Sequence, residues 1–219
     1  MTPQAGLFLS CLAFVGLHFL LSHPLRAPLV RRLGEKGFQG LYSVLALITF
    51  GLMIYFYRVI GREVQVWNFG EWVWPIGVAL MWLGSILFVG SFLGNPALPG
   101  ARLERGRAAK GVFGITRHPM MWSFAIWAAV HFAVQGTGKA LVFDLTIIFL
   151  AIVGSIGQDA KKAKLKGERF HEWAAQTAFI PFTKGVAWPG MTAFVGGTLL
   201  FLVATWLHPM PVGIWRWIG

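Results

Sequence analysis

Long apolar runs alternate with short polar or basic stretches along this chain. The runs cover residues 4–22, 41–60, 73–93, 119–136, 140–157 and 190–208, and each is long enough for the roughly 17–25 residues that a helix needs to cross a bilayer core. Only residues 135–138, with the sequence QGTG, separate the fourth run from the fifth, which predicts a tight helical hairpin. The pattern therefore predicts an all-α integral membrane protein, a bundle of about six transmembrane helices.

The segment 159–178, DAKKAKLKGERFHEWAAQTA, is too polar to span a membrane. It predicts a short amphipathic helix on the cytoplasmic face, with Phe170 and Trp173 turned toward lipid or toward the bundle. No internal repeat and no low-complexity linker interrupts the sequence. Residues 1–219 are therefore expected to form a single membrane domain, in which 190–219 adds a last span and an aromatic tail, GIWRWIG, that anchors at the interface.

Composition and charge support the membrane assignment. Charged residues make up 12% of the chain and hydrophobic residues 56%, whereas soluble domains contain about 25% charged residues. The formal net charge is +11, but most Lys and Arg fall in alternate loops, at 26–36, 102–117 and 161–184. Because basic loops stay in the cytoplasm, we expect a multi-pass membrane protein, in contact with lipid, with both termini on the outer side. The basicity then reflects topology and not nucleic-acid binding.

The N-terminal run and the single cysteine each narrow the choice of structure. The run has no basic segment before it and no small-residue cleavage motif after it, so we expect it to be retained as the first helix. With Cys11 as its single cysteine, the chain can form neither an internal disulfide nor a thiolate metal site.

The polar residues that stand out in the apolar runs are histidines. His18 lies on an apolar face of the first run and His131 on an apolar face of the fourth, while His118 follows Arg117 at the mouth of the fourth run. An ionisable residue inside a membrane segment indicates a functional site by default. The other histidines lie at helix ends or in the amphipathic segment, where a solvated ring needs no further explanation: His23, His171 and His208.

Two interpretations of His18 and His131 stay open at this point. In the first, each is a structural histidine that is hydrogen-bonded to a neighbouring helix. In the second, the two histidines face each other across a metal ion. Haem iron is favoured because imidazole is a common axial ligand, and zinc is disfavoured because these faces lack the carboxylate or thiolate that completes a tetrahedral set. Measured along ideal helices, His18 lies about 12 Å from Arg26 and His131 about 21 Å from Arg117. One iron, about 2 Å from each ring nitrogen, therefore requires tilted helices or an Arg117 that enters the bundle.

His118 cannot share a metal ion with His131, because the two lie about 20 Å apart along one helix. Its ring either caps the helix that starts at Pro119, bonded to a loop carbonyl, or contacts an anion or substrate beside Arg117. In both cases we expect Arg117 and His118 to stabilise the cytoplasmic end of the fourth run.

Three stretches in fixed order carry a family resemblance: GLHFLLSHPLRAPLVRRLGEKGFQGLYSVLALITFGL, NPALPG and GVFGITRHPMMWSFAIWAAVHFAVQG. Together with the later G-x-x-F and T-x-x-IPF elements, they resemble the NnrU family of bacterial membrane proteins over residues 6–182. The family includes a 15-cis-ζ-carotene isomerase of plants and cyanobacteria, which is a haem b protein. For bacterial members the resemblance implies a link to denitrification, around nitric oxide reductase function. It also implies the bacterial inner membrane, so that both termini are expected to be periplasmic.

The haem ligands that this resemblance implies fall on His18 and His131. In such a site Arg117 and His118 line the cytoplasmic mouth. Arg117, joined by Arg26, is then a candidate for pairing with the haem propionates, since guanidinium and carboxylate groups form strong paired contacts.

One position departs from the isomerase pattern. The isomerase has a cysteine three residues before its second ligand, and this chain has Ala128 there, which places thiol-linked redox behaviour in doubt. The resemblance implies an apolar small molecule as the ligand, such as a polyene or nitric oxide, and a respiratory or denitrification enzyme as a partner.

A weaker resemblance indicates a different chemistry. RHPMMW and GERFHEWAAQTAFIPF are similar to elements of isoprenylcysteine and phospholipid methyltransferases, which bind S-adenosylmethionine between the two elements and carry a Glu pair just before the second. Residues 158–160 of this chain read QDA instead, so methyl transfer is the alternative function. A cofactor-free scaffold, in which His18 and His131 only bond neighbouring helices, is the third.

Overall fold

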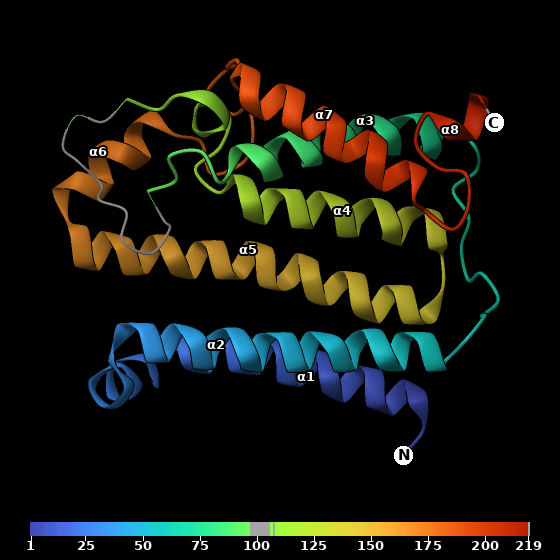
Figure 1. The fold of residues 1–219 in the computed structure, drawn as a ribbon, viewed down its shortest axis with the longest axis horizontal. Helices are drawn as coiled ribbons and strands as arrows, with labels where there is room; N and C mark the ends of the chain where they lie inside the picture. Colours follow the sequence, from blue (N-terminus) through green and yellow to red (C-terminus); the bar gives the residue numbers. More distant parts are fainter. Residues whose placement is uncertain (97–105, 107, 219) are drawn as a thin grey trace. The chain divides into compact units, whose positions relative to one another are not determined.

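The computed structural model describes residues 1–96, 106 and 108–218, and within these ranges it contains helices and no strand (Figure 1). The prediction of an all-α protein is confirmed. Part of the NPALPG stretch and the basic residues Arg102, Arg105 and Arg107 lie outside the described residues. The elements are α1 (Pro3–Ser22), α2 (Arg26–Val59), α3 (Val73–Gly90), the 3-10 helix η1 (Gly111–Gly114), α4 (Pro119–Gln135), α5 (Gly138–Lys166), α6 (Glu168–Gln176), α7 (Met191–Trp206) and α8 (Trp215–Ile218).

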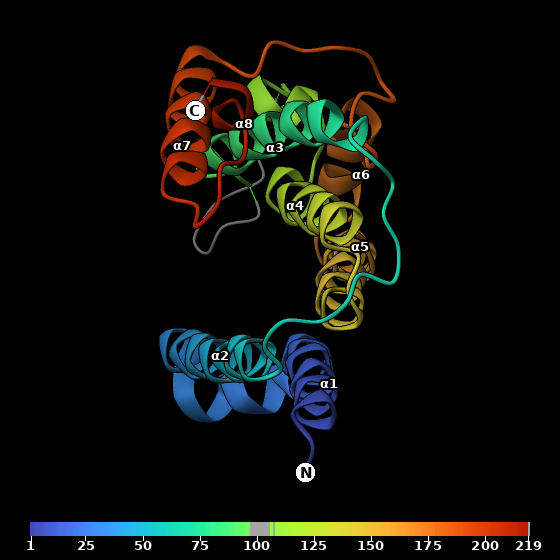
Figure 2. The same cartoon turned by 90° about the vertical axis from the view of Figure 1, so that its right-hand side faces the viewer.

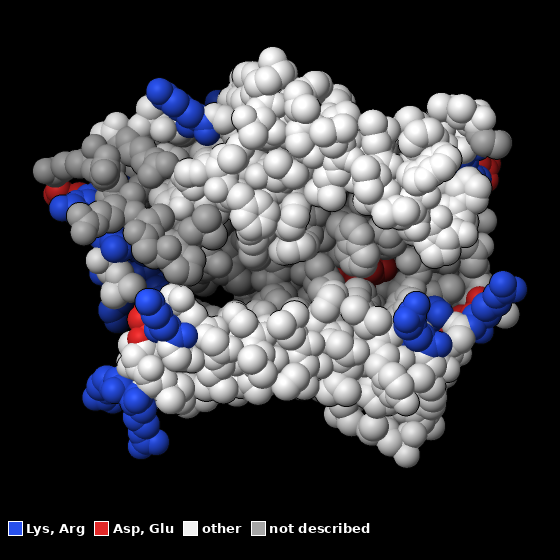
Figure 3. Space-filling model, viewed as in Figure 1, with Lys and Arg blue, Asp and Glu red and all other residues white. Residues whose placement is uncertain are grey.

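The helix lengths fit a membrane protein. Of the helices in the described ranges, α1, α2, α3 and α5 are long and apolar enough to cross a bilayer. The other two predicted spans are shorter, with 17 residues in α4 and 16 in α7. On the face shown in Figure 3, the segment that Figure 1 labels α2 carries its Lys and Arg at its two ends and is uncharged between them. An apolar band between charged ends is what a lipid bilayer requires of a spanning helix.

Two predicted boundaries are wrong. The run 41–60 is only the second part of α2, which begins at Arg26 and turns at Gly34, where φ is 70°. The predicted amphipathic segment 159–178 is divided, because α5 continues to Lys166 and α6 begins after Gly167, where φ is 52°. Ala and Lys are good helix formers, so their polar sequence prolongs α5 instead of ending it. Many basic residues expected in loops therefore lie on helical extensions.

Contacts between Cα atoms divide the chain into two units, which are described separately. The first unit comprises Met1–Asn68 and His131–Leu150. Figures 1 and 2 show α1 and α2 side by side in it, and Gly6 allows the ring of Phe56 to approach α1 so closely that a Cβ atom would overlap it. The start of α5 joins them through ring contacts such as that between Phe50 and Phe143, whose centroids are 6.1 Å apart.

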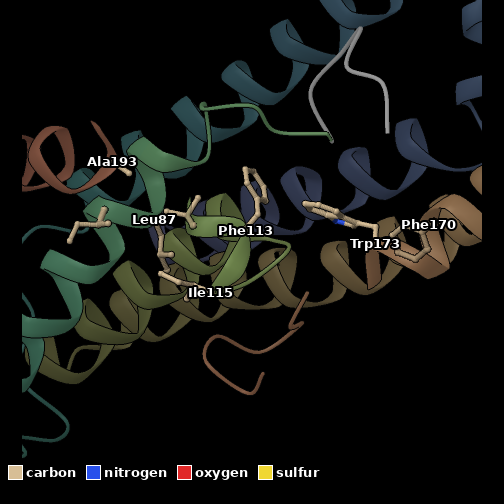
Figure 4. Packing of buried hydrophobic residues seen from close by; sticks show 8 residues of the cluster. Leu87, Phe113, Ile115, Phe170, Trp173 and Ala193 are labelled. Carbon is tan, nitrogen blue, oxygen red and sulfur yellow. The ribbon is translucent and has the colours of Figure 1, made fainter. Parts of the chain in front are cut away.

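The second unit comprises Phe69–Val130 and Ala151–Gly219. In it α7 packs against α3 at Gly197, where a Cβ atom would overlap the backbone of Ile86. The core of this unit brings α3, η1, α6 and α7 together, as Figure 4 shows for part of it. Its buried members are Ile86, Leu87, Val112, Phe113, Ile115, Phe170, Trp173 and Ala193.

This core also settles the orientation of α6. Phe170 and Trp173 are both 5% exposed, and Trp173 lies 6.0 Å from Phe113 between ring centroids. The apolar face of α6 therefore packs into the protein and not into lipid.

Candidate functional site

His18 lies on α1, and one of its ring nitrogens forms a hydrogen bond within the helix. Its Nδ1 is 2.6 Å from the carbonyl oxygen of Phe14, one turn earlier in the helix. A carbonyl oxygen only accepts hydrogen bonds, so Nδ1 carries the proton and Nε2 of the neutral ring carries the lone pair. This is the tautomer in which a histidine binds a metal through Nε2 while a backbone carbonyl orients the ring.

Aromatic side chains hold the His18 ring in this orientation. The centroid of Phe14 is 4.3 Å from that of the imidazole, and the centroid of Tyr42 on α2 is 5.3 Å away. His18 itself is half-buried. The ring therefore sits between two helices of the first unit, on a largely aromatic surface.

His131 lies four residues before the end of α4 and is also half-buried. The helix end that carries it is fixed by Trp67, whose indole Nε1 donates a hydrogen bond of 3.2 Å to the carbonyl oxygen of Phe132. The rings of Trp67 and Phe132 are 4.8 Å apart between centroids. The two predicted haem ligands, His18 and His131, thus belong to the same unit and come from different helices.

Arg26, the first residue of α2, lies in this unit as well. Its Nη2 forms an ion pair of 2.6 Å with Oε1 of Glu35, and its guanidinium lies 5.4 Å from the centroid of the Phe38 ring. Both partners of the ion pair are substantially exposed. An exposed pair of this kind contributes little stability, so Glu35 is an easily replaced partner for this arginine.

Arg117 and His118 belong to the second unit, where they share one carboxylate. Nε and Nη2 of Arg117 each lie 2.7 Å from Oδ2 of Asp159 on α5, and Nε2 of His118 lies 2.8 Å from Oδ1. Nη1 of Arg117 donates to the carbonyl oxygen of Thr177 at 3.0 Å. Nε and Nη2 of Arg117 share one oxygen of the carboxylate, and such charge-assisted bonds are roughly twice as strong as bonds between neutral groups.

Backbone bonds join the same two stretches of sequence. The amide of Arg117 donates to the carbonyl oxygen of Ala178 at 2.8 Å. Oγ1 of Thr116 and Nε1 of Trp122 both donate to the carbonyl oxygen of Phe179, each at 2.8 Å. The ITRHPMMW and TAFIPF stretches therefore form one connected structure.

His118 is 5% exposed, and its surroundings determine its charge. Burial lowers the pKa of its imidazole below the usual value, and this effect exceeds the opposing effect of Asp159. The neighbouring Lys162 and Arg117 lower the pKa of His118 further. The ring is therefore neutral at neutral pH and donates its Nε2 proton to Asp159.

The expected contacts of His118 need a correction. Its ring bonds a carboxylate and not a loop carbonyl, and the anion beside Arg117 is Asp159 of the chain itself. Pro119 does begin α4, as expected. In the sequence, Asp159 is conspicuous only as part of the QDA segment that departs from the methyltransferase pattern. Asp144 was not predicted as a site residue, although it is a lone acid within the apolar run 140–157.

Comparisons with known proteins identify a family and one similar protein. A family model described as NnrU protein matches residues 6–216. The chain is similar to the 15-cis-zeta-carotene isomerase, chloroplastic, of Arabidopsis thaliana, with 26% identity over 189 residues, 83% of this chain and 50% of that protein. It thus spans about half the length of this relative. No solved structure matches the chain.

Proposed function

Because this chain belongs to the NnrU family, we propose that it is a haem b-binding membrane protein that isomerises double bonds of an apolar polyene. His18 and His131 would hold the haem in the first unit. The observation that carries the proposal is the bond from Nδ1 of His18 to the carbonyl oxygen of Phe14, because it directs the lone pair to Nε2. A neutral imidazole that donates from Nδ1 leaves Nε2 unprotonated, as ligation of iron through Nε2 requires.

The donor chemistry fits haem. Among the described residues no three His, Cys, Asp or Glu side chains lie together as ligands of a bare metal ion. Haem needs only one or two axial ligands from the protein, and His18 and His131 are imidazoles of the kind that fill these positions. Bound haem would supply an iron able to polarise a double bond or exchange an electron with it.

The protein's own residues would bind and orient the substrate. Phe14 and Tyr42, which hold the His18 ring, offer flat apolar surfaces that a conjugated chain can lie against. The outer face of α2 exposes aliphatic side chains such as Leu47, which is 70% exposed. A polyene dissolved in the bilayer can therefore reach the unit without passing through water.

The three remaining predicted residues have different places in this proposal. Arg26 is the candidate for a haem propionate, because it lies in the same unit as His18 and its present partner, Glu35, is exposed. Arg117 and His118 are bound to Asp159. We therefore assign these two the role of fixing the loop before α4, and through it the start of the helix that carries His131.

The test is an isomer assay with the haem-loaded protein in lipid vesicles that contain 15-cis-ζ-carotene, with isomers separated by chromatography. Wild-type protein is expected to convert the 15-cis isomer, and His18→Ala and His131→Ala to lose at least tenfold in rate, about 1.4 kcal/mol in the barrier. His23→Ala is the matched control, since His23 is exposed just beyond the end of the same helix as His18.

Each other outcome would replace the proposal by a defined alternative. Haem-loaded protein that binds nitric oxide but leaves the polyene unchanged would indicate a role in denitrification. Binding of S-adenosylmethionine that persists in both histidine variants would indicate a methyltransferase. Activity unaffected by His18→Ala and His131→Ala would overturn the assignment of these ligands.

A further inference from the structure

Asp144 is a carboxyl group buried within a helix that is apolar enough to cross a membrane. It lies six residues after the first residue of α5, about 9 Å along the helix, and is 2% exposed. Its Oδ2 has no hydrogen-bond partner among the described residues. A hydrocarbon polyene has no atom that could bond this oxygen, so the proposed isomerase function does not explain Asp144.

The neutral acid is the least costly form of this side chain. An unpaired buried polar atom is costly, and an ionised carboxylate in apolar surroundings costs far more. Oδ2 receives no hydrogen bond among the described residues that would stabilise a negative charge. The neutral acid is thus the favoured form of Asp144, in a place where protein chains rarely keep an acid without a use for it.

The phenol of Tyr57 contacts both the α4–α5 hairpin and the part of α5 that carries Asp144. Tyr57, close to the end of α2, lies 5.4 Å between ring centroids from Phe143, the residue directly before Asp144. The hydroxyl of Tyr57 donates a hydrogen bond to Oε1 of Gln135, the last residue of α4. Both Tyr57 and Gln135 are half-buried. The phenol thus bonds the last residue of α4 and packs against the residue that precedes the buried acid.

The hairpin end itself is polar. The backbone amide of Lys139 donates to Oε2 of Glu63 at 2.8 Å, and Nζ of Lys139 donates to the carbonyl oxygen of Gly61. Nε2 of Gln65 donates to the carbonyl oxygen of Gln135 at 3.2 Å. Nζ of Lys139 also lies 4.5 Å from the centroid of the Tyr57 ring. Water reaches this end, since the bonds of Gln65 and of Lys139 Nζ are exposed.

We propose that Asp144 is an intramembrane proton-binding site that exchanges its proton with water at the α4–α5 hairpin through Tyr57. In the release step the O–H bond of the Asp144 acid breaks and an O–H bond forms on the phenol oxygen of Tyr57. Tyr57 gives its original hydroxyl proton to water, so that a carboxylate and a hydronium ion result and Tyr57 is unchanged. The reverse step reloads Asp144.

Other titratable groups of the surrounding elements bear on this exchange. Glu63 beside the hairpin would draw protons toward it, and Lys139 would repel them. Glu63 accepts a bond from the backbone amide of Lys139, and Nζ of Lys139 lies over the Tyr57 ring.

Infrared spectroscopy of the full chain in detergent tests the proposal and does not depend on haem. At neutral pH, the infrared spectrum of the wild-type protein minus that of Asp144→Asn is expected to show the C=O stretching band of a protonated acid. Transfer to deuterated buffer is expected to shift this band, and to do so at least several-fold more slowly in Tyr57→Phe. Asp159→Asn is the matched control, because Asp159 is paired with Arg117 and its loss should remove a carboxylate band instead.

Three results would overturn the proposal. Loss of a carboxylate band in Asp144→Asn would mean that Asp144 is ionised. A band that does not shift in deuterated buffer would mean that its proton is trapped. Exchange at the wild-type rate in Tyr57→Phe would exclude the route through Tyr57. If Asp144→Asn does not fold, Asp144→Leu serves in its place, because an apolar side chain suits this buried position.

Discussion

At the scale of single residues, the carboxylate of Asp159 holds two segments of the second unit together. One carboxylate accepts bonds from Arg117 and His118, which lie on a different segment of the chain. The side chains of Arg117 and Asp159 are 16% and 15% exposed, so little solvent is available to replace the lost bonds. Asp159 therefore joins the end of α5 to the loop before α4.

The substitution Asp159→Asn tests this role. It removes the negative charge and leaves the guanidinium of Arg117 partly buried without its ion-pair partner, so we expect the free energy of unfolding to fall by about 2–3 kcal/mol. Thermal or denaturant unfolding of the detergent-solubilised protein measures the change. Glu71→Gln is the control, because Glu71 pairs with Arg216 at the same 2.7 Å but is 82% exposed, and such a pair contributes about 0–1 kcal/mol. Equal effects of the two substitutions would contradict the account.

His118 gives a prediction about pH. Burial lowers its folded-state pKa, so between that value and the unfolded value of about 6.5 the unfolded chain binds more protons. The stability that neutral His118 contributes is therefore present above about pH 6.5 and is lost as the pH falls through the interval below it. Unfolding measured between about pH 7.5 and pH 5 should show stability falling with acid, and more weakly in His118→Gln. An identical pH dependence in both proteins would refute the assignment.

The sequence predicted part of this site for a clear reason. His18, His131, Arg117 and His118 were identifiable because a polar residue in or beside an apolar run is conspicuous. The partner of His118 was not, because Asp159 lies 41 positions later and only the packing of α5 brings it close. The proton position on His18 likewise depends on the backbone bond to Phe14, which appears only once α1 is built.

At the scale of secondary-structure elements, close helix packing depends on glycine. At Gly197 in α7 a Cβ atom would overlap the backbone of Ile86 in α3. Backbone atoms cannot move aside as a flexible side chain can. In membranes, small residues at such contacts let helices approach where the hydrophobic effect contributes little.

We expect Gly197→Ala to lower the free energy of unfolding by about 1–3 kcal/mol, the usual cost of overpacking. Gly51→Ala is the matched control, because Gly51 lies within α2 with open space around it and alanine there should stabilise the helix by about 0.5–1 kcal/mol. The two variants should therefore shift the unfolding midpoint in opposite directions. A stabilising Gly197→Ala would show that α3 and α7 do not pack as closely as described.

The bounds of a helix were predicted well where the whole helix is apolar and of membrane-spanning length. The first span was expected at 4–22, and α1 covers Pro3–Ser22. The errors occurred where helices continue into polar sequence, as α5 does to Lys166. Hydropathy marks the part of a helix that suits lipid, whereas backbone hydrogen bonding continues until a residue such as Gly167 adopts a left-handed conformation.

At the scale of the whole molecule, the family match and the two units describe the chain differently. The match extends over residues 6–216 and so includes α7 and the start of α8, beyond the 6–182 inferred from motifs. The predicted residues divide between the units: His18, His131 and Arg26 in the first, Arg117 and His118 in the second. The proposed haem chemistry thus belongs to the first unit, and the joined ITRHPMMW and TAFIPF stretches to the second.

The most direct test of the central claim is the visible absorption spectrum of the purified protein, oxidised and then reduced with dithionite. We predict a Soret band with sharp α and β bands on reduction, lost or shifted in both His18→Ala and His131→Ala and unchanged in His23→Ala. A protein that stays colourless after expression with added haem and after titration with haemin would contradict the claim, as would a haem spectrum that neither His18→Ala nor His131→Ala alters.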